Sequence, residues 1–174
     1  MQETFALRPF ARQDLEKVMN INQICLPENY SPYFFIDLYE RYPSTFIVAE
    51  ADQKVVGYIM CRIERDFTSF SGFGISKKAH VVSIAVLPAY QKKGVGTTLM
   101  KEAMNNMPLY KAKECYLEVR VSNTPAVNMY KRLGFQIVRK NTAYYADGED
   151  AYVMAKRLDN QNPSISHDRK DEHA

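Results

Sequence analysis

Residues 83–96 read SIAVLPAYQKKGVG, a β-branched strand that runs into a tight turn and then into a helix. A helix start presents unpaired backbone N–H groups and the positive end of the helix dipole. Gly94 and Gly96 let the backbone approach a ligand closely, and Lys92 and Lys93 add positive charge. The turn therefore predicts a cradle for a pyrophosphate. Glycine spacing alone leaves an ordinary strand-to-helix turn open, because it fits neither G-x-x-x-x-G-K-[ST] nor G-x-G-x-x-G.

Hydrophobic periodicity on both sides of this segment predicts one α/β (α+β) domain. Apolar side chains that recur every three or four residues indicate a helix, and strict alternation indicates a strand. Helices are expected over residues 12–26, 33–42, 96–107 and 125–133, and strands over residues 4–9, 46–51, 55–64, 80–87, 115–121, 135–145 and 151–156. The polar, glycine-containing segment 66–78 is expected to be a loop. The resulting order, β-α-α-β-β-β-α-β-α-β-β, indicates helices packed on a mixed sheet.

Length and composition bound the class of protein. The 174 residues are 46% hydrophobic and 25% charged, enough for one domain with a sizeable core. A net charge of +3 gives little support for a specific nucleic-acid-binding protein. We expect residues 1–158 to form the domain and residues 159–174, which hold few hydrophobic side chains, to be a flexible C-terminal tail. In that tail His167 and His173 are expected to be solvated rather than to bind a metal.

The cysteines and the apolar runs point to a cytoplasmic protein. Cys25, Cys61 and Cys115 lie far apart and form no C-x-x-C pair, so neither a disulfide framework nor a zinc site is expected. The N-terminal residues lack the pattern of a signal peptide, and no apolar run reaches the roughly 18 residues of a membrane span. We therefore expect no membrane partner and no metal.

Two motifs resemble those of the GNAT acetyltransferases. Residues 91–96, QKKGVG, match the family signature Q/R-x-x-G-x-G/A, and residues 123–135 match its second signature, N-x-x-A-x-x-x-Y-x-x-x-G-F. The resemblance implies a GNAT fold, with a mixed, mostly antiparallel central sheet flanked by helices and splayed central strands. It also implies acetyl-CoA as co-substrate.

The same resemblance assigns a cofactor site. It implies that acetyl-CoA is bound by Gln91, Lys92, Lys93, Gly94, Val95, Gly96, Thr97, Asn123 and Tyr130. A backbone N–H among Ile84, Ala85 and Val86, where the family's strand splays open, would stabilise the oxyanion. Tyr130 is a candidate proton donor to the departing thiolate, and the alternative is a core tyrosine on an amphipathic helix.

Two further segments narrow the resemblance. Residues 26–30, LPENY, and residues 144–152, YYADGEDAY, resemble the catalytic subunit of the N-terminal acetyltransferase A complex and its archaeal single-chain relatives. The similarity runs from about residue 4 to residue 158. It implies acetylation of the α-amino group of protein N-termini.

Glu118 is the first candidate base. In the strand 115–121, Tyr116, Glu118 and Arg120 share one face, and charged groups on a central strand are costly to bury without a purpose. A salt-bridged pair on a covered face is the alternative. The archaeal relatives use a glutamate here, paired with a histidine that begins the preceding strand, and His80 matches that histidine.

Glu28 is the second candidate. On residue type alone it is an ordinary loop acid, but the resemblance places it at the substrate amine. Leu26 and Tyr30 would wall the pocket for the first residue of the peptide, and Arg120 would order the substrate loop. The resemblance likewise implies that Tyr144 and Tyr145 bind the peptide backbone, the alternative being an aromatic pair at the sheet edge.

The expected substrates are therefore N-termini beginning with Ser, Ala or Thr, with Met-Leu termini tolerated. Rival functions are acetylation of a ribosomal protein's N-terminal alanine, acetylation of a small-molecule amine, and acyl-CoA binding without catalysis. Retention of His80, Glu118 and Glu28 together argues against the non-catalytic rival. The ribosome or a nascent chain is a candidate partner.

Overall fold

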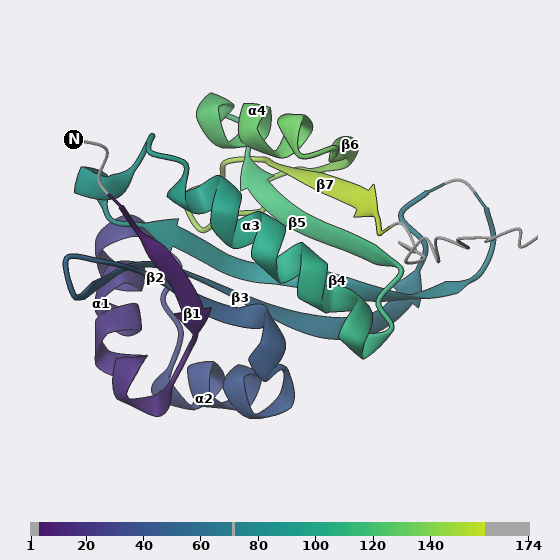
Figure 1. Ribbon diagram of the computed structural model, residues 1–174. Coiled ribbons are helices and arrows are strands. Elements are labelled where there is room, and N and C mark those ends of the chain that lie inside the picture. The colour runs from purple at the N-terminus through teal and green to yellow at the C-terminus, as the bar shows by residue number, and fades with distance from the viewer. Residues whose placement is uncertain (1–3, 71, 159–174) are drawn as a thin grey trace, which may run out of the picture.

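The computed structural model describes residues 4–70 and 72–158. The strands are β1 Ala6–Pro9, β2 Phe46–Ala51, β3 Lys54–Phe67, β4 Ile75–Val86, β5 Glu114–Arg120, β6 Gln136–Asn141 and β7 Ala151–Arg157, and the α-helices are α1 Leu15–Cys25, α2 Pro32–Arg41, α3 Val95–Asn106 and α4 Thr124–Arg132. They follow the predicted order. The strands form one seven-stranded sheet in the order β1-β2-β3-β4-β5-β7-β6, with α1 and α2 on one face and α3 and α4 on the other (Figure 1).

The sheet opens in its middle. All neighbouring strands are antiparallel except β4 and β5, which are parallel and paired only between Lys78–His80 and Glu114–Tyr116. Beyond this short junction β4 stays with β3 as far as Val86, and β5 stays with β7 as far as Arg120. The predicted splaying of the central strands is confirmed, and it leaves a gap between two otherwise well-paired halves of the sheet.

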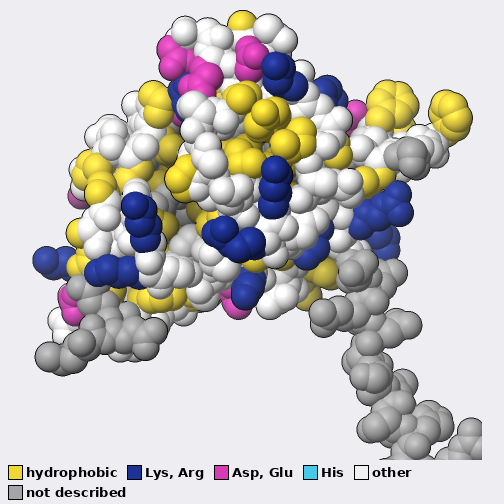
Figure 2. Space-filling model, turned by 90° about the horizontal axis from the view of Figure 1, so that it is seen from above, with side chains coloured by type: hydrophobic (Ala, Val, Ile, Leu, Met, Phe, Trp, Pro, Cys, Tyr) yellow, Lys and Arg dark blue, Asp and Glu magenta, His cyan; other side chains and the backbone are white. Residues whose placement is uncertain are grey.

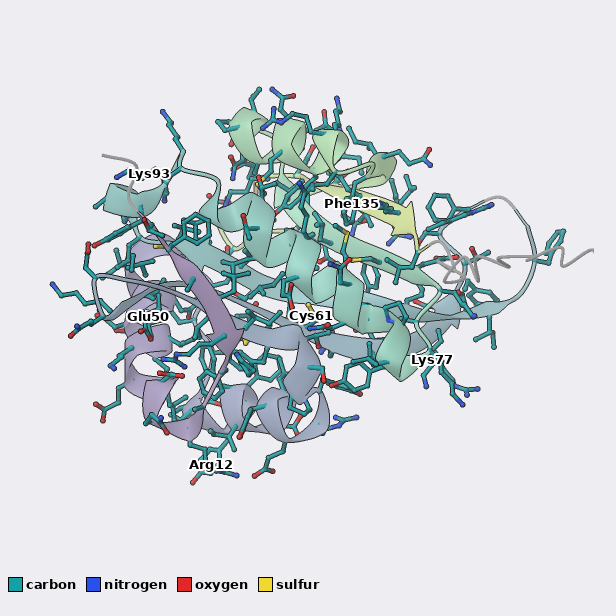
Figure 3. The ribbon with its side chains drawn as sticks, viewed as in Figure 1. Arg12, Glu50, Cys61, Lys77, Lys93 and Phe135 are labelled. Carbon is teal, nitrogen blue, oxygen red and sulfur yellow. The ribbon has the colours of Figure 1, made fainter. Side chains whose placement is uncertain are left out.

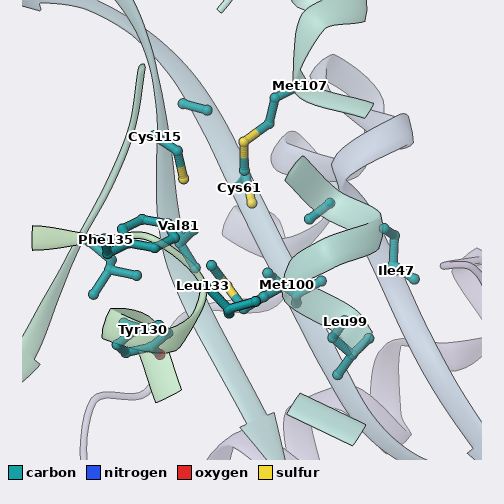
Figure 4. Packing of buried hydrophobic residues seen from close by; sticks show 14 of the residues in the cluster. Ile47, Cys61, Val81, Leu99, Met100, Met107, Cys115, Tyr130, Leu133 and Phe135 are labelled. Carbon is teal, nitrogen blue, oxygen red and sulfur yellow. The ribbon is translucent and has the colours of Figure 1, made fainter. Parts of the chain in front are cut away.

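A hydrophobic core fixes α3 over one of these halves. Leu99, Met100 and Ala103 recur at helical spacing and are fully buried against the sheet. Tyr130 of α4 and Phe135 complete this core, with their rings 5.9 Å apart (Figure 4). Helix α3 is therefore anchored on the half of the sheet that ends in β4.

The prediction of a loop over residues 66–78 is wrong at both ends of that segment. Strands β3 and β4 continue as a long hairpin, in which Phe67 pairs with Ile75, and only residues 68–74 connect them. The sequence looks like a loop because this hairpin extends past the core and buries little; hydrophobic side chains project at its end (Figure 2). The start of the connecting loop is held by buried Glu114, which accepts hydrogen bonds from the Thr68 hydroxyl and the Ser69 N–H.

The strand predicted over residues 135–145 is also too long. Strand β6 ends at Asn141, opposite Ala151, the first residue of β7, so the residues beyond it have no partner strand. Ala143 has a φ of 50° and donates its N–H to the Asp150 carboxylate 2.8 Å away. Residues 142–150 therefore form a loop rather than a continuation of the strand.

Part of the chain lies outside this description. The predicted tail over residues 159–174, with His167 and His173, falls outside the described residues. Across residues 4–70 and 72–158, no helix is long and apolar enough to cross a membrane.

Candidate active site

A cleft of about 280 Å³ occupies the gap between β4 and β5. The loop between α1 and α2 forms one wall, the loop between β6 and β7 another, and α4 closes a third side. Predicted site residues that line it are Leu26, Glu28, Tyr30, Ile84, Glu118, Arg120, Asn123, Tyr130, Tyr144 and Tyr145. Segments far apart in the chain thus meet where the sheet opens.

Glu118 and His80 lie together at the base of the cleft. Strand alternation directs Glu118 to the face opposite α3, as predicted, and its Oε2 is 2.6 Å from Nε2 of His80. His80 is 8% exposed and does not line the cleft, so it lies behind Glu118. Within the described chain Oε2 bonds only to His80 and Oε1 makes no hydrogen bond.

Glu64 of β3 is a functional candidate that sequence reasoning missed. Its Oε1 lies 3.2 Å from Nδ1 of His80, on the side of the ring away from Glu118. Oε1 also accepts from Nε of Arg62, and Oε2 accepts from the hydroxyl of Tyr116. The signal was present, since residues 62 and 64 share a face of a predicted strand, but residue type alone did not separate this pair from a surface ion pair.

The electrostatics of this group favour a charged imidazole between two carboxylates. Burial lowers the pKa of His80, but the hydrogen bonds and charges of Glu118 and Glu64 outweigh burial and raise it above its usual value. The hydrogen bond from His80 lowers the pKa of Glu64 to about 2 against the effect of burial. Tyr116 stacks on the imidazole, with ring centroids 4.4 Å apart and planes 3° from parallel.

Glu28 projects into the cleft from the loop between α1 and α2. Buried Asn22 fixes this loop by donating Nδ2 to the Glu28 carbonyl, 3.1 Å away, and the Tyr30 hydroxyl donates to the Val82 carbonyl. The Glu28 carboxylate accepts from Nη2 of Arg120 at 3.0 Å. Its position at the mouth of the cleft agrees with a substrate-facing acid and not with a loop acid pointing away.

Arg120 ties together the two loops that border the cleft. Its Nη1 donates to Asp147 at 2.9 Å and to Glu149 at 2.9 Å, across the cleft from Glu28. Its guanidinium lies over the ring of Tyr145, 4.0 Å from the centroid. The hydrogen bond with Glu149, more than the other acidic contacts, raises the pKa of Arg120, so it is a permanent charge in an acidic surround.

The turn before α3 has the form of an anion cradle. Gly94 caps the helix with a φ of 84°, a left-handed conformation that favours glycine, and Lys92 also has a positive φ, 61°. Lys93 lies at the same turn (Figure 3). The first N–H groups of α3, from Val95 on, face outward without intrahelical acceptors, as at any helix start. Gly96 and Thr97 continue that first turn, so the predicted residues fit a pyrophosphate.

Gln91, the first residue of the motif, bonds to the strand that precedes the turn. Its Nε2 donates to the Val86 carbonyl at 2.8 Å, which ties the turn to the end of β4. Its contact is thus with the protein backbone.

A β-bulge at Val82 shapes the strand that borders the cleft. Met60 pairs with Ser83 and Cys61 with Val81, so Val82 is the extra residue. After the bulge, Leu87 donates its N–H to Val56 of β3, and strand alternation then turns the N–H of Ala85 toward β3 and those of Ile84 and Val86 toward the gap. Of these three residues, only Ile84 lines the cleft.

Asn123 and Tyr130 come from the start and the middle of α4. Asn123 is the N-cap, its side-chain oxygen accepting from the Ala126 N–H at 3.3 Å. Tyr130 is 6% exposed and belongs to the core, and burial raises the pKa of its hydroxyl. Asn123 and Tyr130 also line the cleft. Tyr130 is therefore both a core residue and a residue of the candidate site.

Comparison with known proteins gives consistent matches. The model of the acetyltransferase (GNAT) family matches residues 15–135. An N-alpha-acetyltransferase of Sulfurisphaera tokodaii is 49% identical over 156 residues, which cover 88% of this chain and 93% of the relative. The Arabidopsis thaliana N-terminal acetyltransferase A complex catalytic subunit NAA10 is 37% identical over 148 residues, 83% of this chain and 73% of the relative.

A solved structure is similar in both fold and sequence. It is Arabidopsis thaliana Naa50 in complex with the bisubstrate analogue CoA-Ac-MVNAL. The match has a TM-score of 0.75 and 25% identity, and it covers 87% of this chain and 97% of that chain.

Proposed function

This chain belongs to the GNAT acetyltransferase family and acetylates protein N-termini with acetyl-CoA, and we propose that two carboxylates facing one cleft, Glu118 and Glu28, carry the reaction. The observation that supports this most is the open Oε1 of Glu118 at the point where β4 and β5 diverge. A carboxylate there is a suitable acceptor for the proton of an α-amine, whose ordinary pKa of about 7.7–8.0 makes its removal a modest task.

Each step of the acetyl transfer is assigned to a residue that lies in or behind the cleft. The amine nitrogen attacks the acetyl carbonyl carbon and its proton passes to Glu118, directly or through one water. The N–H of Ile84 stabilises the negative charge that develops on the acetyl oxygen. The carbon–sulfur bond breaks, and Tyr130 protonates the thiolate that leaves. His80, which lies behind Glu118, acts through that carboxylate rather than on the amine.

The cradle before α3 suits the other end of acetyl-CoA. The left-handed Gly94, the helix start and the two lysines together offer N–H donors and positive charge to the pyrophosphate. Asn123 positions α4, and through it Tyr130, beside the cleft. Acetyl-CoA would thus extend from α3 to the gap, where its acetyl group meets Glu118.

The substrate-facing loops support a preference for small or polar first residues. Glu28 presents a carboxylate to the first side chain, flanked by Leu26 and Tyr30, and Tyr144 and Tyr145 are placed to bond the peptide backbone. We therefore propose Ser, Ala and Thr as preferred first residues, with Met-Leu termini tolerated. Arg120 holds the two loops in position for the peptide.

We also propose in which compartment the enzyme acts and what presents its substrate. The cysteines of the described chain are free, and two of them are buried, which supports a reducing cytoplasm. Exposed basic residues on α4 and β6, among them Lys131 and Arg139, support contact with a ribosome that presents nascent chains. The catalytic domain would extend to residue 158.

Peptides with blocked N-termini test the reaction. The purified chain is incubated with acetyl-CoA and peptides that begin Ser, Ala, Met-Leu or Met-Glu, each paired with an N-terminally blocked twin that keeps an internal lysine. Mass spectrometry should locate acetyl on the free N-terminus only, with the fastest rates for Ser and Ala. Transfer to a small amine alone, or to a ribosomal-protein N-terminus alone, would replace the proposal with those rival functions. No transfer despite acetyl-CoA binding would leave a non-catalytic role.

A further inference from the structure

We propose that Glu64 is a positioning residue of this reaction: it holds the His80 ring from behind, so that Nε2 stays a donor to Glu118 and Oε1 of Glu118 is kept for the substrate amine. The inference rests on the proposed function. It adds a residue from β3, a strand that contributes none of the residues lining the cleft.

Three contacts fix Glu64 itself. Its two oxygens accept hydrogen bonds from His80, Arg62 and Tyr116. A carboxylate held by several donors keeps its charge over most of the pH range, consistent with the lowered pKa of Glu64. Glu64 is therefore a fixed anion beside Nδ1.

A fixed anion at Nδ1 decides the proton arrangement of the ring. Neutral imidazole carries one N–H, and an unprotonated Nδ1 would point its lone pair at the Glu64 carboxylate. Nδ1 therefore carries a proton, and Nε2, 2.6 Å from Oε2 of Glu118, must share a second proton with that carboxylate. Without Glu64 the ring would give up one of these two protons more readily and would be free to rotate.

The two carboxylates flanking His80 are not equivalent. Glu64 is saturated by its donors, whereas Glu118 makes only the His80 bond within the described chain and borders the cleft. Only Glu118 is thus able to meet an incoming amine. Glu64 acts through His80 and touches no substrate.

The remaining groups around the ring support this division. Tyr116 stacks on the imidazole and limits its rotation. The buried Lys78 amine lies over the Tyr116 ring at 4.5 Å and donates to the Phe67 carbonyl. The charged or titratable groups around His80 are Arg62 and Glu64 from β3, Lys78 from β4, and Tyr116 and Glu118 from β5. Among them Glu64 alone bonds Nδ1.

Nuclear magnetic resonance of labelled imidazole tests the first half of the proposal. His80 is one of three histidines, so a His167→Gln, His173→Gln background leaves a single imidazole to follow. In Glu64→Gln the pKa of His80 should fall by about one unit or more, as expected when an opposite charge in contact is lost. Asp66→Asn, which removes a carboxylate two residues along β3, is the matched control and should leave it unchanged.

Kinetics of the same variants test the second half. Glu64→Gln should lower kcat for a Ser-peptide about tenfold or more and shift the pH profile of kcat in step with the His80 pKa, with the KM for acetyl-CoA unchanged. Should Glu64→Gln fail to fold, Glu64→Asp, whose retracted carboxylate weakens the Nδ1 bond, must move both readouts in the same direction.

The outcomes distinguish a failure of the Glu64 proposal from a failure of the proposed function. A wild-type enzyme that acetylates peptides, beside a Glu64→Gln variant with the same His80 pKa or the same kcat, overturns the role of Glu64. A wild-type enzyme that acetylates no peptide overturns the proposed function instead, because the pKa comparison needs no substrate.

Discussion

At the scale of single residues, the two carboxylates in the cleft have different surroundings and hence different jobs. Glu118 is paired with a buried imidazole, while Glu28 is paired with Arg120 at the mouth. Groups whose environments differ in this way usually take different chemical roles. Glu118 suits proton transfer, and Glu28 suits recognition of the first residue.

Replacing Glu28 tests its role in recognition. Glu28→Ala exchanges a polar wall for an apolar one, so the ratio of kcat/KM for Ser-peptides over Met-Leu-peptides should fall on the order of tenfold, the usual scale for one side-chain contact. Competition between the two peptides, read by mass spectrometry, gives the ratio directly. Glu16→Ala, on the exposed side of α1, is the control. An unchanged ratio would remove Glu28 from substrate selection.

Replacing Arg120 tests the link between the substrate loops. Arg120→Ala removes the charge-assisted hydrogen bonds that join the two loops, so the KM for peptide should rise severalfold. The KM for acetyl-CoA should stay near its wild-type value, because the cradle is built elsewhere. Steady-state kinetics with each substrate varied in turn separates the two. Arg139→Ala, an exposed arginine bonded to Asn141 on β6, should change neither, and equal rises in both constants would contradict the assignment.

At the scale of elements, the turn before α3 depends on one left-handed glycine. Gly94→Ala would place a Cβ at a φ of 84°, which costs about 1–2 kcal/mol. The turn is expected to relax and move the N–H donors, which should raise the KM for acetyl-CoA about 5–30-fold and leave the peptide KM unchanged. Gly74→Ala carries similar strain, at a φ of 136°, in the remote β3–β4 turn and should leave acetyl-CoA kinetics unchanged. Titration of acetyl-CoA at saturating peptide makes the comparison.

Within single elements, the structure could be predicted from the sequence where the local hydrophobic pattern and the packing agree. Strand β5 alternates cleanly, so the shared face of Glu118 and Arg120 could be predicted. The hairpin beyond the core could not, because its residues bury little and its connecting loop is held by Glu114, which lies on another strand. Glu64 was missed for the same reason: its partner His80 lies on another strand, 16 residues away.

At the scale of the whole molecule, the fold supplies a gap that no local pattern contains. The sheet stays paired on both sides, while β4 and β5 separate after three paired positions. The core under α3 and α4 spans both halves, and a second core packs α1 and α2 on the half that ends in β4. The site is therefore open in the middle of a sheet that is packed on both faces.

The free energy of unfolding should depend on pH because the folded protein holds a charged imidazole at His80. Because the pKa of His80 is raised in the folded state, its stabilisation is fully present below the unfolded value of about 6.5 and is lost as the pH rises through the folded value. Urea denaturation should give a smaller free energy of unfolding at pH 8 than at pH 6. His80→Gln should flatten that difference, and a wild-type stability that rises over this range would contradict the assignment.

The rate of acetyl transfer by a Glu118→Gln variant is the sharpest test of Glu118 as the general base. The amide keeps an oxygen for the His80 bond but cannot take a proton, so kcat for a Ser-peptide should fall about 10²–10⁴-fold, with the KM for acetyl-CoA and the melting temperature near wild type. Glu16→Gln should behave as wild type. A Glu118→Gln enzyme that folds and keeps kcat within about threefold of wild type, well short of the usual contribution of a general base, would show that this carboxylate is not the base.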